Sequence, residues 1–359
     1  MLLGMSGLGA VCGFAEQKGT AFQAEWRRYE DPATELEVLR LTDPAHTSLL
    51  PATYNRFHAR RNSFLIFSSD RTGSFQAFRL DLKNGDLRQI TEASAVDPRS
   101  LYLLPNEREF CYFDGQNLCT AHLENLRSRE VYSVPAGWSR CDGCTVSSDG
   151  QRTFFGERQG ERSRLRAVIL RRGSAATIVE PEFQLSHPLP NPRRAQVLYR
   201  QGDEALWLVN MEGKQNRRLR LAGGRIGPAR WSPDGRAIIY LHFPADPKKL
   251  NALREHTPDE NADKPIGDTS QFVQFAGNGD TSVFVGASRN RAAPHVLLFL
   301  RVTRREFTLC EHAAKDPSSV SPVFSPDSQR IYFETDRHGK PAIYAMRVER
   351  LVESTDEER

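Results

Sequence analysis

The feature that most constrains the fold is a turn motif that recurs along the chain. Its most complete copies read Trp-Ser-Pro-Asp-Gly and Phe-Ser-Pro-Asp-Ser, and a short β-rich run follows each copy. Seven copies, about 40 to 50 residues apart, begin at Phe57, Leu104, Val146, Pro190, Trp231, Phe275 and Phe324. This period predicts a repeat architecture in which each repeat is one supersecondary unit.

Two repeats show the whole unit. Residues 65–91 contain a β-rich run, an Asp-Arg-x-Gly turn, a second run, an Asn-Gly turn and a third run, and residues 331–348 repeat the first part of this order. Turn residues stand where the chain must reverse tightly. A further strand precedes the Pro-Asp-Gly or related turn, so each repeat has four short strands, which make one propeller blade. The sequence therefore predicts an all-β fold, a seven-bladed β-propeller of four-stranded antiparallel blades.

The last repeat lacks a fourth strand, because residues 349–359 are mostly charged. Residues 36–42, ahead of the first repeat, resemble the missing strand, so we expect them to pair with residues 341–348 and close the ring. The expected organisation is an export signal at 1–15, an N-terminal extension at 16–34, the propeller at 35–350 and a charged tail at 351–359. Residues 244–268, rich in Pro and charge, are expected to form an excursion loop.

Composition excludes several classes of protein. With 49 Lys+Arg against 45 Asp+Glu, the formal net charge is only +4, so we expect no nucleic-acid partner. Beyond residue 15, no apolar run reaches the roughly 20 residues that a membrane helix needs. Residues 1–15 are uncharged and end in Gly-Phe-Ala, a small-x-small pattern that favours an export signal although a basic start is missing. The expected location is periplasmic or extracellular, with a cytoplasmic location as the alternative.

The cysteine pattern leaves two interpretations open. Cys141 and Cys144 form a lone C-x-x-C pair, whereas a structural zinc site normally needs a second pair. In an exported protein the two thiols could form a disulfide. The alternative, which we favour, is that they are small buried residues at a turn and a strand start.

The repeat unit resembles that of TolB-type propellers, and the order of motifs over about residues 30 to 350 resembles the oligogalacturonate lyase family. The most specific matches are Val-Pro-Ala-Gly-Trp at 134–138 and His-Gly-Lys-Pro-Ala at 338–342, with Trp-Leu-Val-Asn at 207–210 between them. The resemblance implies β-elimination of short pectin fragments. In this family a divalent metal, usually Mn²⁺, binds the uronate carboxylate and acidifies the adjacent C5 proton, which an Arg removes.

The resemblance also locates the positions of the metal ligands and of the base. Where the family has one His in the sixth blade and a Gln and two His in the last blade, this sequence has Gln271, Asp316, Ser319 and Ser321. The position of the basic Arg corresponds to Ala205. Hydroxyl groups are poor Mn²⁺ ligands and one carboxylate does not replace three imidazoles. The sequence therefore predicts no tightly bound manganese.

Four residues are candidates for binding substrate: His187, Arg230, Gln271 and His312. His187 is expected on an inner strand and Arg230 precedes the Trp of the fifth turn, where a guanidinium could hold a carboxylate in bidentate fashion. Each also has a structural interpretation, favoured for His312. Two functions remain open. The first is a lyase-like enzyme acting on an acidic oligosaccharide, and the second is a non-catalytic exported propeller that binds a protein partner or a glycan.

Overall fold

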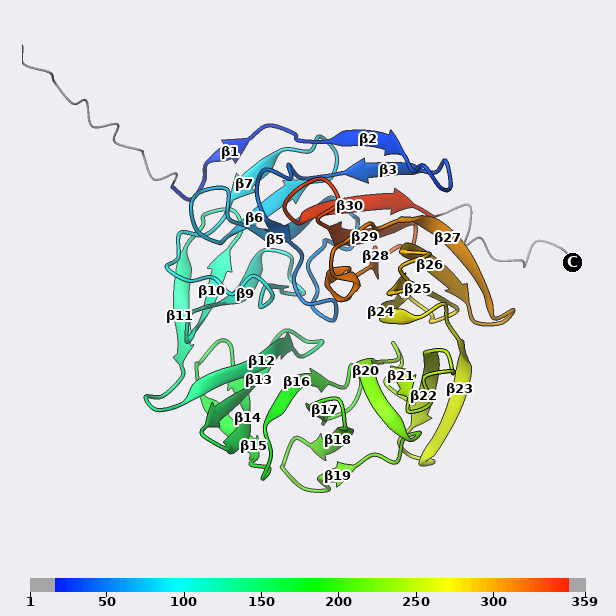
Figure 1. The fold of residues 1–359 in the computed structure, drawn as a ribbon. Coiled ribbons are helices and arrows are strands. Elements are labelled where there is room, and N and C mark those ends of the chain that lie inside the picture. The colour runs from blue at the N-terminus through cyan, green and yellow to red at the C-terminus, as the bar shows by residue number, and fades with distance from the viewer. Residues whose placement is uncertain (1–16, 349–359) are drawn as a thin grey trace, which may run out of the picture.

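Seven antiparallel sheets form a ring in the computed structural model, which describes residues 17–348 (Figure 1). Five sheets have four strands, which follow one another along the chain. In the two five-stranded sheets, strands from the N-terminal end of the chain join strands that lie later in the sequence. The predicted seven-bladed β-propeller is confirmed. The predicted export signal at 1–15 and charged tail at 351–359 lie outside the described residues.

The strands are numbered in chain order and grouped here by blade, from the channel outward. Blade one contains β4 (Ser48–Leu49), β5 (Phe64–Ser69), β6 (Gln76–Asp81), β7 (Leu87–Gln89) and β1 (Ala21–Phe22). Blade two contains β8 (Tyr102–Leu103), β9 (Glu109–Asp114), β10 (Asn117–His122) and β11 (Ser128–Ser133). Blade three contains β12 (Ser139–Val146), β13 (Arg152–Gln159), β14 (Arg162–Ile169) and β15 (Ala175–Val179). Blade four contains β16 (Leu185–Pro190), β17 (Gln196–Gln201), β18 (Ala205–Asn210) and β19 (Arg217–Arg218).

The remaining three blades complete the ring. Blade five contains β20 (Gly224–Trp231), β21 (Ile238–Pro244), β22 (Ala252–Thr257) and β23 (Ala262–Asp268). Blade six contains β24 (Phe272–Gly277), β25 (Val283–Ser288), β26 (His295–Leu300) and β27 (Arg305–Glu311). Blade seven contains β28 (Val323–Phe324), β29 (Arg330–Thr335), β30 (Ala342–Arg347), β3 (Glu37–Arg40) and β2 (Arg27–Glu30). One 3-10 helix, η1 (Pro317–Ser319), precedes β28, and no helix in residues 17–348 is long and apolar enough to cross a membrane.

The repeated Ser-Pro-Asp-Gly motif is a structural turn. In blade five, Asp234 accepts the backbone N–H of Arg236 at 3.0 Å and the hydroxyl of Ser232 at 2.6 Å, and these bonds lower the pKa of its carboxyl group. Gly235 adopts a φ of +69°, which glycine reaches without steric cost. Each such turn joins a blade's innermost strand to the next strand, so the motif recurs once per blade.

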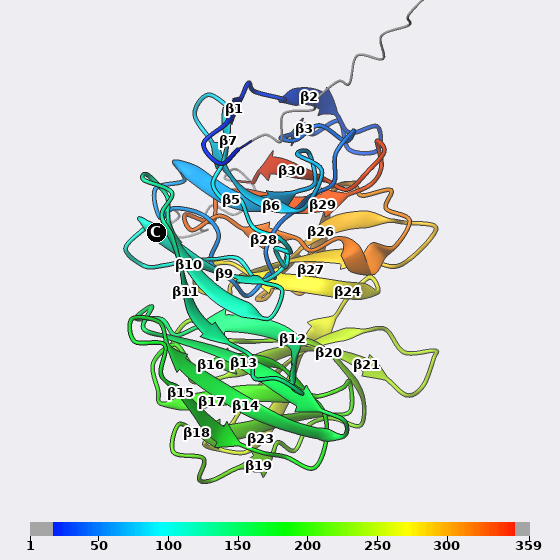
Figure 2. The ribbon, with the colours of Figure 1, turned by 90° about the vertical axis from the view of Figure 1, so that its left-hand side faces the viewer.

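The N-terminal residues close the ring as expected. Leu39 of β3 is paired with Ala345 of β30, and Thr42 accepts the N–H of Ile343 at 2.9 Å. The expectation of an extension outside the propeller at 16–34 needs correction, because β2 pairs with β3, and β1 pairs with β7 of blade one. Figure 2 shows β1 and β2 beside the outer strands of these two blades. An outer strand that pairs with a further segment no longer presents open backbone groups.

Residues 244–268 are not a simple excursion loop, and this expectation was wrong. They contain all of β22 and β23, the two outer strands of blade five. Leu253, His256 and Ile266 are buried there, Arg254 and Asp263 form a half-buried ion pair, and Lys264 is exposed. The charged outer face of an edge strand hid the alternation that marks a half-buried strand.

Candidate functional site

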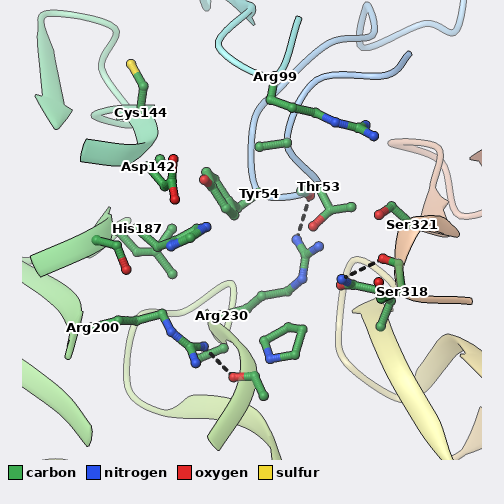
Figure 3. Close-up of a pocket in the computed structure, with 18 of the residues that line it drawn as sticks. Thr53, Tyr54, Arg99, Asp142, Cys144, His187, Arg200, Arg230, Ser318 and Ser321 are labelled. Atoms are coloured by element: carbon green, nitrogen blue, oxygen red, sulfur yellow. Dashed lines mark hydrogen bonds between the residues drawn. The ribbon is translucent and has the colours of Figure 1, made fainter. Parts of the chain in front are cut away.

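A cavity of about 740 Å³ lies at the end of the channel where the inner strands begin. Its volume is typical of a small-molecule site. Side chains from several blades surround it, and Figure 3 shows Arg99, His187, Arg200 and Arg230 around Tyr54. We call it the channel cavity.

Bulges in four consecutive inner strands shape the wall of this cavity. The pairing register shifts between Arg140 and Cys144 in β12, within β16 around His187, and between Ile226 and Ala229 in β20. A smaller shift occurs in β24, ahead of Gln274. A bulge leaves its extra residues out of the ladder and redirects their side chains. Residues of all four bulged segments line the channel cavity.

The bulges of β12 and β16 touch one another. Gly143 has a φ of +89°, and a Cβ atom added to it would lie 2.6 Å from the Cα atom of His187 and 3.1 Å from the hydroxyl oxygen of Tyr54. Only glycine allows this approach. His187 itself has a φ of +48°, and its ring lies edge to face with Tyr54 at 6.1 Å between centroids.

His187 is a neutral imidazole at neutral pH. Burial, together with the nearby charge of Arg200, lowers its pKa to about 4. Its Nδ1 atom is buried and has no hydrogen-bond partner among the described residues. Burial also raises the pKa of Tyr54, so its phenol stays protonated.

Arg200 and Arg230 are cations that hydrogen-bond to carbonyl oxygens. Arg200 donates to the carbonyl oxygens of Ile226, at 2.6 Å, and Gly227, both at the β20 bulge. Arg230 donates to the carbonyl oxygens of Thr53, at 2.6 Å, and Phe275, at 3.2 Å, and its buried Nη2 atom has no partner among residues 17–348. Burial lowers the pKa of both guanidinium groups, that of Arg230 to about 10. Neither is within ion-pair distance of a described carboxylate.

The other two arginines of the cavity are paired. Arg99 donates to both carboxylate oxygens of Glu334 at 2.6 and 2.9 Å, and Arg140 forms an ion pair with Asp97. Glu334 also accepts the N–H of Leu50, at the start of the segment that carries Thr53 and Tyr54. The Arg99–Glu334 pair therefore holds the start of residues 50–54, and Arg99 also donates to the carbonyl oxygen of Leu50 at 2.8 Å. Tyr54 and Arg230 also line a second cavity of about 310 Å³, so they stand where the two cavities meet.

Some of the site residues predicted from the sequence line the channel cavity, and others do not. His187, Arg230, Ser319 and Ser321 line the channel cavity. Gln271 does not; the glutamine of β24 in this cavity is Gln274. His312, proposed as a substrate-binding candidate, is fully buried away from it, with Nε2 2.8 Å from the carbonyl oxygen of Ser288 and Nδ1 accepting the N–H of Ala314 at 3.0 Å. Both ring nitrogens are used, so His312 is structural.

Tyr54, Arg99, Arg140 and Arg200 were missed as cavity residues. A partial signal was available, because Gly or Pro inside a strand pattern marks a bulge. Three such signals are present: Asp-Gly inside the C-x-x-C pair, His187-Pro188 and Gly227-Pro228. The C-x-x-C pair is therefore part of a bulge, and the five cysteines of the described chain are buried and free, as we expected. Cys141 and Cys144 nevertheless lie within β12, not at a turn and a strand start.

The positions expected for metal ligands do not suit Mn²⁺. Asp316 is exposed at the N-cap of η1, where it accepts the backbone N–H of Ser318 at 2.9 Å and its hydroxyl at 2.7 Å. The hydroxyl of Ser319 donates to the carbonyl oxygen of Asp316. Gln271 lines a different cavity. Within residues 17–348, no group of three or more His, Cys, Asp or Glu side chains is placed to hold a metal ion. These residues do not fit the metal.

Fold and site together define a seven-bladed β-propeller with a ligand-sized, arginine-lined cavity at one end of its channel. The family model described as oligogalacturonate lyase matches residues 16–162. An oligogalacturonide lyase of Pectobacterium atrosepticum is 24% identical over 92% of this chain and 98% of its own, and an oligogalacturonate lyase of Dickeya dadantii is 22% identical over the same shares.

A solved oligogalacturonate lyase in complex with manganese superposes with a TM-score of 0.88 at 24% identity, covering 92% of this chain and 98% of the other. At this identity the likeness in structure establishes the fold. The protein therefore has the fold of the oligogalacturonate lyases and is similar to them in sequence over nearly its whole length.

Proposed function

We propose that this protein binds oligogalacturonate-type acidic oligosaccharides in the channel cavity and cleaves them by β-elimination without manganese. One observation carries the proposal: Arg200 and Arg230 are half-buried cations that lie within ion-pair distance of no described carboxylate. Burying an unpaired charge is costly, and a charge-assisted bond to a carboxylate recovers much of that cost. A uronate carboxylate supplies the missing negative charge.

The same pairing favours elimination. A proton on the carbon next to an ionised carboxylate is a very weak acid, and a guanidinium that neutralises the carboxylate makes its removal easier. The neutral imidazole of His187 accepts this C5 proton, and the protonated phenol of Tyr54 donates a proton to the departing C4 oxygen. The electron pair of the C5–H bond forms the C4–C5 double bond as the C4–O bond breaks.

A specific observation favours a second candidate, a glycan-binding propeller without catalysis. Ala205, at the position where the resemblance puts the base, is a buried residue of β18 outside the channel cavity. Both candidates therefore bind the oligosaccharide in the channel cavity, and only the first cleaves it.

The decisive experiment measures binding and turnover on one preparation. Calorimetry with a short oligogalacturonate should show binding that persists after dialysis against a chelator, with no binding of a neutral oligosaccharide of equal length. Absorbance of the unsaturated uronate then reports elimination. Binding without product would support the second candidate, and absence of binding would overturn both.

Variants assign the roles. Replacing both His187 and Arg230 by Ala should abolish binding while circular dichroism and the unfolding temperature still report a folded propeller. His187→Ala alone should lower the elimination rate by about a hundredfold or more and change affinity less. Arg236→Ala, an exposed arginine in a turn away from the channel cavity, is the matched control. Unchanged binding by the double variant would contradict the assignment.

A further inference from the structure

A cavity of about 400 Å³ adjoins the channel cavity over blades five and six. Its lining residues lie at the end of β21, just before β24 and just after β25. These strand ends are on the same side of the ring as the channel cavity. Phe243 is the residue that lines both cavities. We call the smaller one the Phe243 cavity.

The ring of Phe243 is fixed at this boundary. A Cβ atom added to Gly227 would lie 2.9 Å from the Cε2 and Cζ atoms of the ring, so the ring packs directly on the backbone of the β20 bulge. The ring is half-buried, and the guanidinium carbons of Arg225 and Arg289 lie 5.5 and 6.0 Å from its centroid. These are cation–π distances. An aromatic ring flanked by two cations is thus presented between the two cavities.

The Phe243 cavity has an excess of positive charge. It is lined by Arg225, Lys249 and Arg289 against one acid, Asp246, whose carboxylate accepts the backbone N–H of Lys248 at 2.9 Å. Arg225 has a partner, Asp203, at 3.1 Å. Arg289 and Lys249 are within ion-pair distance of no carboxylate in residues 17–348. Two cations here are therefore free to meet an anionic ligand.

We propose that the Phe243 cavity is a second uronate subsite, which takes the next sugar of a chain bound in the channel cavity. This inference rests on the proposed function and specifies where the second sugar of its substrate binds. The apolar C–H face of a sugar ring stacks on Phe243, and the sugar's carboxylate pairs with Arg289 and Lys249. The backbone N–H of Arg289 donates to the carbonyl oxygen of Gln271 at 3.0 Å, which anchors this residue to the start of blade six.

The test compares galacturonate with a four-residue oligogalacturonate by calorimetry. The wild-type protein should bind the oligomer more tightly than the monomer. Arg289→Ala should weaken oligomer binding by about tenfold and leave monomer binding unchanged, because Arg289 lines only the Phe243 cavity. Phe243→Ala should also weaken oligomer binding by about tenfold and should affect the oligomer more than the monomer. Arg289→Lys, which keeps the charge, should recover part of the loss. Phe307→Ala, an exposed phenylalanine on outer strand β27, and Arg236→Ala are matched controls and should bind like the wild type.

The outcomes separate this inference from the proposed function. Oligomer and monomer binding with equal affinity, or an oligomer affinity unaffected by Phe243→Ala and Arg289→Ala, would overturn the second subsite while the channel cavity stands. A wild-type protein that binds neither ligand would overturn the proposed function itself.

Discussion

Arg230 differs from other charged side chains around the channel because its protein partners are all neutral. Arg99 and Arg140 are each paired with a carboxylate, whereas Arg230 has two carbonyl partners and a buried Nη2 atom without a partner among the described residues. A buried, unsatisfied donor costs about 1–3 kcal/mol. A purely structural arginine does not need an unsatisfied donor. An arginine that recognises a carboxylate does, because the ligand then accepts the hydrogen bond.

At the same scale, Asp316 allows a prediction about manganese. Its carboxylate is already used as the N-cap of η1, and the serines beside it offer neutral hydroxyls. We expect less than stoichiometric manganese after dialysis, and oligogalacturonate binding unchanged by added Mn²⁺, as measured by elemental analysis and calorimetry. Stoichiometric manganese that is lost on Asp316→Ala would show that this assignment of the site is wrong.

His58 predicts how stability depends on pH. Burial lowers its pKa from 6.5 to about 4, and its Nδ1 atom is buried without a described partner. Between these values the unfolded chain binds more protons than the folded one, so the free energy of unfolding decreases as pH falls from about 6.5 to about 4. His58→Gln should remove on the order of 2 kcal/mol of that decrease. Urea unfolding at pH 8 gives the pH-independent cost of the substitution. If the free energy of unfolding fell equally with pH in the wild type and in His58→Gln, the prediction would be contradicted.

At the scale of elements, the inner-strand bulges explain how a regular fold carries a specific site. Gly143→Ala should destabilise the fold by about 2 kcal/mol or more and weaken oligogalacturonate binding, because the new methyl group meets the backbone of His187. Gly115 is the matched control, since it has a φ of +58° and open space around it, and its replacement by Ala should cost only about 1 kcal/mol. Chemical denaturation and calorimetry check both effects. Equal losses in the two variants would show that the contact with His187 is unimportant.

At the scale of the whole molecule, stability depends on the strand that closes the ring. Val38 of β3 is completely buried, although it lies far along the chain from β30, with which β3 pairs. Val38→Asp places a charge in this core and should lower the free energy of unfolding by at least about 3 kcal/mol, measured by urea denaturation. Arg28→Ala, on the exposed face of β2, should change it by less than about 0.5 kcal/mol. A Val38→Asp protein as stable as the wild type would mean that β3 does not close the ring.

The sequence by itself determined the number of blades, their turns and the strand that closes the ring. The turns are local features, because a Ser-Pro-Asp-Gly turn is specified by the residues that compose it. The closing strand could be predicted because the last repeat lacks one strand and residues 36–42 resemble it. Only the tertiary structure decided which side chains share the channel cavity. Gln271 precedes β24 and lines a different cavity, whereas Gln274, which follows the bulge of β24, lines the channel cavity. Likewise, Tyr54, Arg200 and Arg230 meet because three distant segments converge on one axis, and no local pattern records that convergence.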